Sequence, residues 1–178
     1  MNTEITYRKA MQRKIANISA TASTMRKQAP PGSIDLTIAY LAKINLDELM
    51  QVSNQNSLSD WLDSHTDSLA QQTFRCNNFG GPRKVVNIFL KEISHNRTLS
   101  IYIPDEIRDL LEVPLDKDVA KGLARDWAGL GFNSLPRWDG IKHLTPSMSE
   151  SYQAAAAIVA KNEGVCRVDL DLKYWRGA

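Results

Sequence analysis

The chain has 178 residues, 43% hydrophobic and 24% charged, which suits one domain with a buried core. No stretch approaches the roughly 18 consecutive apolar residues of a membrane span, and the N-terminus lacks the apolar block of a secretory signal. Cys76 and Cys166 have no CxxC spacing, which argues against a disulfide framework and a zinc site. We therefore expect a cytoplasmic protein that uses no metal or other cofactor and contacts no membrane.

The formal net charge of +2 is unevenly distributed along the chain. Residues 1–28 hold six basic groups and one acidic group, residues 34–70 hold one basic and six acidic, and residues 75–108 hold six basic and three acidic. If the two basic segments share a face, they can hold a polyanion. The alternative is that basic and acidic helices pair with one another or face water.

The first 28 residues predict one basic amphipathic helix, an arm ahead of a helical globular domain over residues 33–178. A proline- and glycine-rich segment separates the two. The apolar stripe of this helix can pack on the body of the chain or on a second copy, so a homodimer through this helix is one expectation. Its apolar positions recur at spacings of three and four residues and are Met11, Ile15, Ile18, Ala22 and Met25.

Three further helices are predicted in residues 33–74. Either Ser33 or Asp35 can cap the first of them. Residues 45–55 form the second, and residues 60–74 form the third, because apolar side chains recur there at helical spacing.

The centre of the chain predicts a buried helix over residues 83–94, where apolar side chains occur on most sides. Pro82 is suited to its first position. Residues 98–103 alternate as a β-strand does but have no partner strand, so we expect an extended segment or a turn. A short helix follows over residues 104–111.

The last third predicts three more helices and one loop. Pro114 opens the first helix, and residues 133–145 form a loop with one helical turn. Thr145, followed by a proline, marks a strong helix start, and Gly164 marks the end of that helix. Residues 165–175 form the last one. The predicted class is all-α, a single multi-helix domain of about eight helices.

Two of the predicted helix starts place ionisable side chains near the first turn. Residues 79–87, Phe-Gly-Gly-Pro-Arg-Lys-Val-Val-Asn, contain Lys84, and residues 113–119, Val-Pro-Leu-Asp-Lys-Asp-Val, contain Asp116. If the fold brings these starts together, an amine and a carboxylate face a common cleft. If it keeps them apart, Lys84 is a surface lysine and Asp116 is a helix cap.

These two segments resemble motifs of the helix-hairpin-helix DNA glycosylase superfamily. In that family a glycine-rich hairpin leads into a helix with a catalytic lysine, and the segment from Gly80 to Lys84 is similar to a degenerate form of it. A catalytic aspartate opens a later helix of the family, and Asp116 with its neighbours fits that pattern closely. Residues 123–127 look like the continuation found in the 8-oxoguanine branch, and the layout is most similar to the archaeal subgroup of that branch.

The resemblance implies an enzyme of DNA repair that cleaves the N-glycosidic bond between a base and its sugar. Asp116 would stabilise the positive charge that develops on the sugar. Lys84 would attack C1′ as a neutral amine and form a Schiff base, after which the strand can be cleaved. The target base has to leave the duplex before it can be reached.

The same scheme implies that residues near the motifs contact DNA. Four aromatic residues near the motifs are candidates for stacking on the base, namely Trp127, Trp138, Phe132 and Tyr102. The alternatives are a core position for each aromatic and a solvated face for each charge. The predicted nucleic-acid contacts are Gly80, Gly81, Arg83, Lys91, Arg97 and Arg137, with Arg8, Lys9, Arg13 and Lys14 as further basic candidates.

Two other functions remain open at this point. The second glycine of the hairpin is displaced and the sequence offers no obvious base pocket, which favours a non-catalytic helical domain that binds nucleic acid or protein. Residues 94–112 are a further departure from the family pattern, an insertion that has to loop out. In addition, Arg137 and His143 have the R-x5-H spacing of a class of helical ribonucleases, although Pro136 and Gly140 place that pair on a loop.

Overall fold

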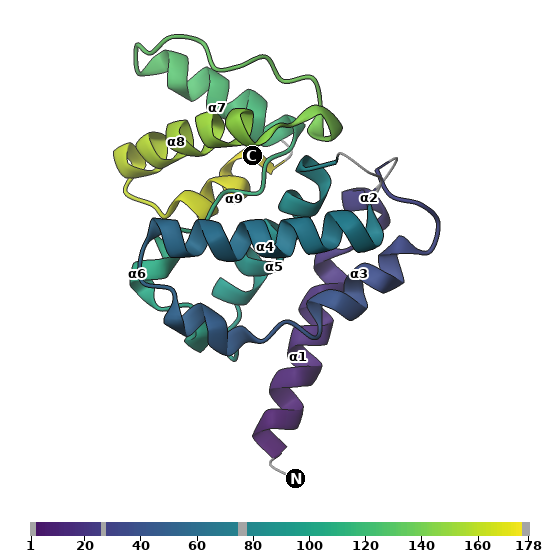
Figure 1. Ribbon diagram of the computed structural model, residues 1–178. Coiled ribbons are helices and arrows are strands. Elements are labelled where there is room, and N and C mark those ends of the chain that lie inside the picture. The colour runs from purple at the N-terminus through teal and green to yellow at the C-terminus, as the bar shows by residue number, and fades with distance from the viewer. Residues whose placement is uncertain (1–2, 26–27, 75–77, 176–178) are drawn as a thin grey trace.

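The structure is a computed structural model that describes residues 3–25, 28–74 and 78–175. Throughout this described part the regular elements are all helices, which confirms the all-α class (Figure 1). The α-helices are α1 (Thr3–Ser19), α2 (Ala22–Met25), α3 (Ser33–Leu41), α4 (Gln55–Thr73), α5 (Gly80–Ser94), α6 (Asp105–Arg108), α7 (Lys117–Gly129), α8 (Pro146–Glu163) and α9 (Leu170–Tyr174). The 3-10 helices are η1 (Leu46–Gln51), η2 (Ser100–Tyr102), η3 (Ile141–His143) and η4 (Arg167–Asp169).

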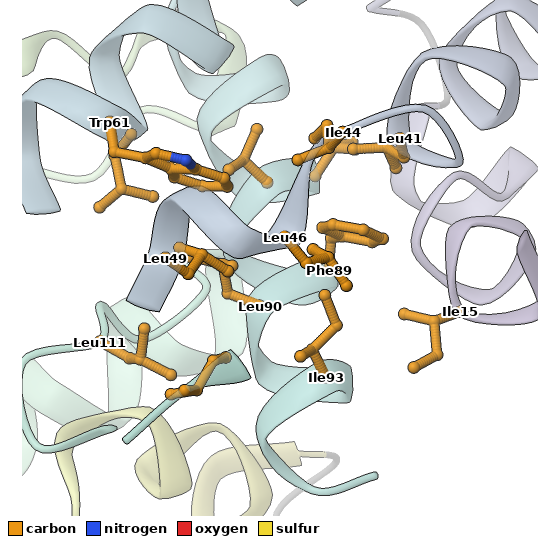
Figure 2. Close-up of a cluster of buried hydrophobic side chains, with 14 of the residues drawn as sticks. Ile15, Leu41, Ile44, Leu46, Leu49, Trp61, Phe89, Leu90, Ile93 and Leu111 are labelled. Atoms are coloured by element: carbon orange, nitrogen blue, oxygen red, sulfur yellow. The ribbon is translucent and has the colours of Figure 1, made fainter. Parts of the chain in front are cut away.

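α5 is the central helix, as its apolar pattern predicts. It contacts α1, α2, α4 and η3, so neighbours cover several of its sides (Figure 2). The burial of these side chains supplies much of the hydrophobic stabilisation of this part of the fold. Five of its apolar residues are at most 1% exposed: Val85, Val86, Phe89, Leu90 and Ile93.

Buried apolar side chains form two clusters. The first cluster surrounds α5 and draws on elements from α1 to α6, with Leu111 and Val168 added from later in the chain. The second cluster begins at Val113 and lies among α7, α8 and α9, which pack together at one end of the molecule (Figure 1). Residues 110–116 therefore lead from one cluster to the other, and α5 and α7 belong to different clusters.

The N-terminal helix is shorter than predicted. α1 ends at Ser19, and α2 is a separate short helix in which the Thr24 amide donates to Thr21 Oγ1 at 3.2 Å. The hydroxyl side chains of this stretch thus support a break in the helix. The single helix over residues 1–28 is wrong over its described part, and residues 26–27 lie outside that part.

The predicted apolar stripe is only partly buried. Ile15 and Met25 belong to the first cluster, whereas Ile18 is 47% exposed. α1 packs on α3 and α5, while its first turns project from the body (Figure 1). Residues on both sides of the predicted domain boundary thus share one core, and both the boundary and a homodimer through this helix stay predictions.

Two helix starts in the first half of the chain differ from expectation. Gly32 precedes α3 with φ 82°, and no side chain caps that helix, so the capping roles predicted for Ser33 and Asp35 are wrong. α4 begins earlier than predicted because Asn54 and Ser57 form a capping box. Between these helices, the expected α-helix is the shorter 3-10 helix η1.

α8 and the loop before it follow their local signals closely. Thr145 Oγ1 accepts a hydrogen bond from the Met148 amide at 3.2 Å, and Pro146 is the first residue of α8. Gly164 ends α8 with φ 70°, a conformation that glycine adopts at no steric cost. The loop before α8 contains one helical turn, η3, as expected, and the β-like alternation near residue 100 gives the 3-10 helix η2.

Candidate active site

Lys84 and Asp116 meet where the two hydrophobic clusters adjoin. The Lys84 Nζ donates a hydrogen bond to Asp116 Oδ2 at 3.1 Å. The side chains are 16% and 32% exposed respectively, so each is partly accessible to solvent. The structure therefore brings together the amine and the carboxylate that the sequence hypothesis requires, while their chemical role stays a prediction.

Asp116 divides its two carboxylate oxygens between two tasks. Its Oδ1 accepts hydrogen bonds from the Asp118 amide at 2.9 Å and the Val119 amide at 3.0 Å, so Asp116 is the N-cap of α7. The helix begins after this residue, and the prediction that Pro114 opens it is wrong. Because Oδ2 remains free to face Lys84, the capping role and a functional role coexist in one side chain.

The glycine-rich segment that leads to Lys84 is buried against protein. The Gly81 amide donates to Asn78 Oδ1 at 3.0 Å, and both hairpin glycines are buried. A Cβ on Gly80 would clash with the Ile141 carbonyl oxygen, and one on Gly81 would lie 2.5 Å from Gln28 Oε1. These glycines permit close helix packing and are covered by it, so the phosphate contacts predicted for Gly80 and Gly81 are wrong.

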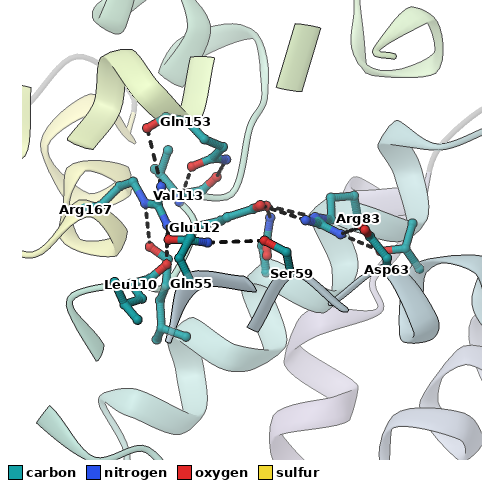
Figure 3. Close-up of polar contacts among 12 residues, drawn as sticks. Gln55, Ser59, Asp63, Arg83, Leu110, Glu112, Val113, Gln153 and Arg167 are labelled. Atoms are coloured by element: carbon teal, nitrogen blue, oxygen red, sulfur yellow. Dashed lines mark hydrogen bonds and ion pairs between the residues drawn. The ribbon is translucent and has the colours of Figure 1, made fainter. Parts of the chain in front are cut away.

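Arg83 is also buried, which contradicts its predicted contact with nucleic acid. Its Nε and Nη2 donate to Glu112 at 2.8 and 2.7 Å, and its Nη1 donates to Asp63 at 2.6 Å (Figure 3). Burial raises the pKa of Glu112, but the hydrogen bonds from Arg83 more than offset this and hold that pKa below its ordinary 4.5. The guanidinium is therefore occupied inside the protein.

The remaining predicted phosphate contacts divide into one mostly buried residue and two exposed residues. Lys91 Nζ donates to Asp171 Oδ2 at 2.6 Å, which ties α5 to α9. Arg97 is exposed, and the Arg137 side chain is 88% exposed beside Asp139. Their positions leave a contact of Arg97 and Arg137 with DNA as a prediction. Of the basic residues of α1, Arg8 is partly buried, whereas Lys9, Arg13 and Lys14 are exposed.

The two tryptophans proposed for base stacking have different surroundings. Trp127 stacks on Phe132 with ring centroids 4.0 Å apart, and its indole N–H donates to the Asn133 carbonyl at 2.7 Å. Asp116 caps the other end of α7, about 16 Å away along the axis at 1.5 Å per residue, so a role of Trp127 in base stacking stays a prediction that requires the base to extend along α7. Trp138 packs against the second cluster, so its role in base stacking stays a prediction.

Three hollows on the surface lie elsewhere. They have volumes of about 490, 620 and 440 Å³ and lie respectively beside His65, beside Arg8 and beside Cys166. None of these three is lined by Lys84 or Asp116. A nucleotide would therefore approach the pair by a route other than these hollows.

The described residues offer neither a metal site nor a membrane-spanning helix. Within the described ranges, no group of three or more His, Cys, Asp or Glu side chains could hold a metal ion. Over those ranges, the helices also lack the combination of length and apolar character needed to cross a membrane. Burial, together with Asp109, raises the pKa of the Cys166 thiol to about 11, which disfavours a reactive thiolate there. Cys76 lies outside the described residues.

Sequence reasoning missed the residues that support the pair, above all Glu112. Two apolar residues precede it and an apolar residue follows it, in the run Leu-Leu-Glu-Val, and a charged residue in such a run is a signal for a buried pair. Arg83 is its partner, but the sequence alone cannot show which cation meets it.

The comparisons with known proteins give no relative for this chain. No family model matches it, and neither the curated proteins nor the solved structures contain a significant match.

Proposed function

We propose that this chain is a DNA-binding enzyme of the base-excision glycosylase class, in which Lys84 is the nucleophile and Asp116 is the charge-stabilising carboxylate. The supporting observation is the 3.1 Å contact between Lys84 Nζ and Asp116 Oδ2, made by partly exposed side chains whose chain neighbours belong to two different clusters. Two groups of complementary chemistry at one place, positioned by separate elements, are what a reacting centre requires.

The proposed reaction begins when the Lys84 ammonium loses a proton to bulk water, which leaves the Asp116 carboxylate, 3.1 Å from the amine, negatively charged. The neutral amine attacks the sugar C1′, and the bond from C1′ to the base breaks with its electron pair leaving on the base. The base takes up the proton that the attacking nitrogen loses. The nitrogen lone pair then forms a Schiff base as the bond from C1′ to O4′ breaks, and O4′ takes a proton from water, which opens the ring. Throughout, the Asp116 charge stabilises positive charge at the sugar.

Trapping with borohydride tests this proposal directly. Reduction of the Schiff base on DNA that contains an abasic site or an oxidised base should yield a covalent adduct, and Lys84→Gln should abolish it. Lys91→Gln is the matched control, because Lys91 is also a half-buried lysine of α5 in an ion pair. An adduct that persists in Lys84→Gln, or is lost equally in Lys91→Gln, would contradict the assignment of Lys84.

Asp116→Asn separates charge stabilisation from structure. Asparagine caps helices as well as aspartate does, so α7 should keep its start. Loss of one preorganised electrostatic group costs on the order of 100- to 1000-fold in rate. We expect that loss in base release, measured under single-turnover conditions, with DNA affinity changed much less. A rate within about twofold of the unmodified protein would contradict the role of the carboxylate.

A non-catalytic DNA-binding domain is the second candidate. It is favoured by the pairing of Lys84 with Asp116, which satisfies both charges, and by the absence of both residues from the three hollows described above. Salt-sensitive binding to DNA, without an adduct on any of the substrates named, would support this candidate. No binding to DNA would contradict both candidates and would indicate a protein partner.

A further inference from the structure

The segment that leads to Asp116 is buried without regular secondary structure, and side chains pair with several of its backbone groups (Figure 3). Arg167 Nε donates to the Leu111 carbonyl at 2.9 Å, and its Nη2 donates to the Leu110 carbonyl. Gln153 pairs with both backbone groups of Val113, accepting at 3.1 Å and donating at 2.8 Å. A buried backbone requires such partners, so α8 and η4 fix the path of this segment.

Glu112, in the middle of this segment, connects it to α5. Its carboxylate accepts a two-pronged interaction from Arg83, at 2.8 and 2.7 Å, and a hydrogen bond from Asn87 Nδ2 at 2.8 Å. The Arg83 and Glu112 side chains are only 7% and 8% exposed. A planar two-pronged pair restricts direction as well as distance, so it sets how α5 lies against the segment before Asp116.

The sequence order places the buried pair of Arg83 and Glu112 next to the contact between Lys84 and Asp116. Arg83 immediately precedes Lys84, and Glu112 lies shortly before Asp116 on the segment that Gln153 and Arg167 hold. The contact between Lys84 and Asp116 is partly exposed, and exposed ion pairs are too weak to align two packed clusters. The alignment has to come from the buried contacts beside it.

We infer that Arg83 and Glu112 are positioning residues, whose buried pair places the Lys84 amine against the Asp116 carboxylate. The importance of this placement for catalysis rests on the proposed function, but the placement itself does not. Apolar side chains of similar size commonly replace buried ion pairs without loss of stability. Stability alone therefore does not account for the pair, whereas its directional geometry does.

Asp63 supplies a matched control. It also accepts from Arg83, at 2.6 Å, but its side chain is 61% exposed. It belongs to α4, which packs on α5 within the first cluster. Asp63→Asn removes a carboxylate charge that faces the same guanidinium, and it leaves the contact between Arg83 and Glu112 in place.

The test uses Glu112→Gln and the double variant Arg83→Met/Glu112→Leu, both in the full chain. Reductive ¹³C-methylation keeps the lysine charge and labels the amine, and Lys84→Arg assigns the Lys84 signal by its disappearance. In the unmodified protein and in Asp63→Asn, adding Asp116→Asn should shift that signal. In the double variant, the Lys84 signal should already have the chemical shift of exposed lysines, and the further change Asp116→Asn should not alter it.

Trapping on abasic DNA gives the second readout. Misplacement by about 1 Å costs on the order of 100-fold in rate, so we expect that loss in the double variant, a smaller loss in Glu112→Gln, and none in Asp63→Asn. If the unmodified protein gives no adduct, the proposed function fails while the lysine signal still decides the positioning.

Three results would overturn the inference. The double variant could keep the response of Lys84 to Asp116→Asn. Asp63→Asn could lose that response as fully as the double variant does. Both the double variant and Glu112→Gln could fail to fold, which would assign the pair to stability alone. A folded double variant that has lost the response would support the inference.

Discussion

Replacement of Asp116 by alanine and by asparagine should affect stability to different degrees, because the side chain has two separable contacts. Alanine removes the cap on the Asp118 and Val119 amides, which is worth about 1 kcal/mol. It also removes the partly exposed ion pair with Lys84, worth up to about 1 kcal/mol. Asparagine keeps the cap and loses only the ion pair.

We therefore expect Asp116→Ala to lower the free energy of unfolding by about 2 kcal/mol, and Asp116→Asn by about 1 kcal/mol or less. For a chain of this size, each 1 kcal/mol lowers Tm by about 2–4 °C. Alanine should thus lower Tm by about 4–8 °C and asparagine by less than about 4 °C, measured by calorimetry and by urea unfolding.

Lys84→Gln provides the control for the ion pair. It removes the same contact as Asp116→Asn. The combined variant Lys84→Gln/Asp116→Asn should therefore lose about as much free energy of unfolding as either single variant, and less than the sum of their losses. If asparagine costs as much as alanine, the capping argument is refuted. If the effects of Lys84→Gln and Asp116→Asn simply add, the two side chains do not interact in solution.

The remaining predictions concern packing and pH. Gly80→Ala should lower the free energy of unfolding by about 1–3 kcal/mol or more, because its Cβ would meet the Ile141 carbonyl, whereas Gly129→Ala, with open space around it, should be neutral or slightly stabilising in urea unfolding. Although burial raises the pKa of Asp126, hydrogen bonds from neighbouring basic groups lower it to about 2, so the unfolded chain binds its proton first. Stability should fall between about pH 4 and pH 2, and Asp126→Asn should flatten that part of the urea-midpoint profile. Burial lowers the pKa of His65 below 6.5, so the unfolded chain binds the proton first and stability should fall as pH drops through 6.5, and His65→Gln should reduce that slope.

The sequence predicts the fold best where a structure depends on nearby residues. The start and end of α8 follow from Thr145, Pro146 and Gly164, whose capping chemistry acts within one helical turn. The burial of α5 follows from apolar side chains on several of its sides. The single long helix over residues 1–28 failed because hydroxyl side chains compete for backbone groups, and the outcome depends on packing that the sequence does not display.

The candidate site was predictable only through the family resemblance. That resemblance singled out Lys84 and Asp116, and the structure brings them together, although no comparison supports the family itself. The roles of Gly80 and Arg83 could not be predicted, because each depends on a partner far along the chain, Ile141 in one case and Glu112 in the other. Sequence motifs indicate which residues are candidates for a site. The contacts of those residues depend on segments that are distant in the sequence, and these contacts determine their roles.

Identification of the lysine that DNA captures tests the central claim most directly. After borohydride reduction on DNA with an abasic site, the adduct can be digested with protease and nuclease and the modified peptide sequenced by mass spectrometry. The account predicts that the sugar remnant lies on the Lys84 amine and that Asp116→Asn reduces its yield. A remnant on other lysines, at yields that follow their exposure to solvent, would contradict it.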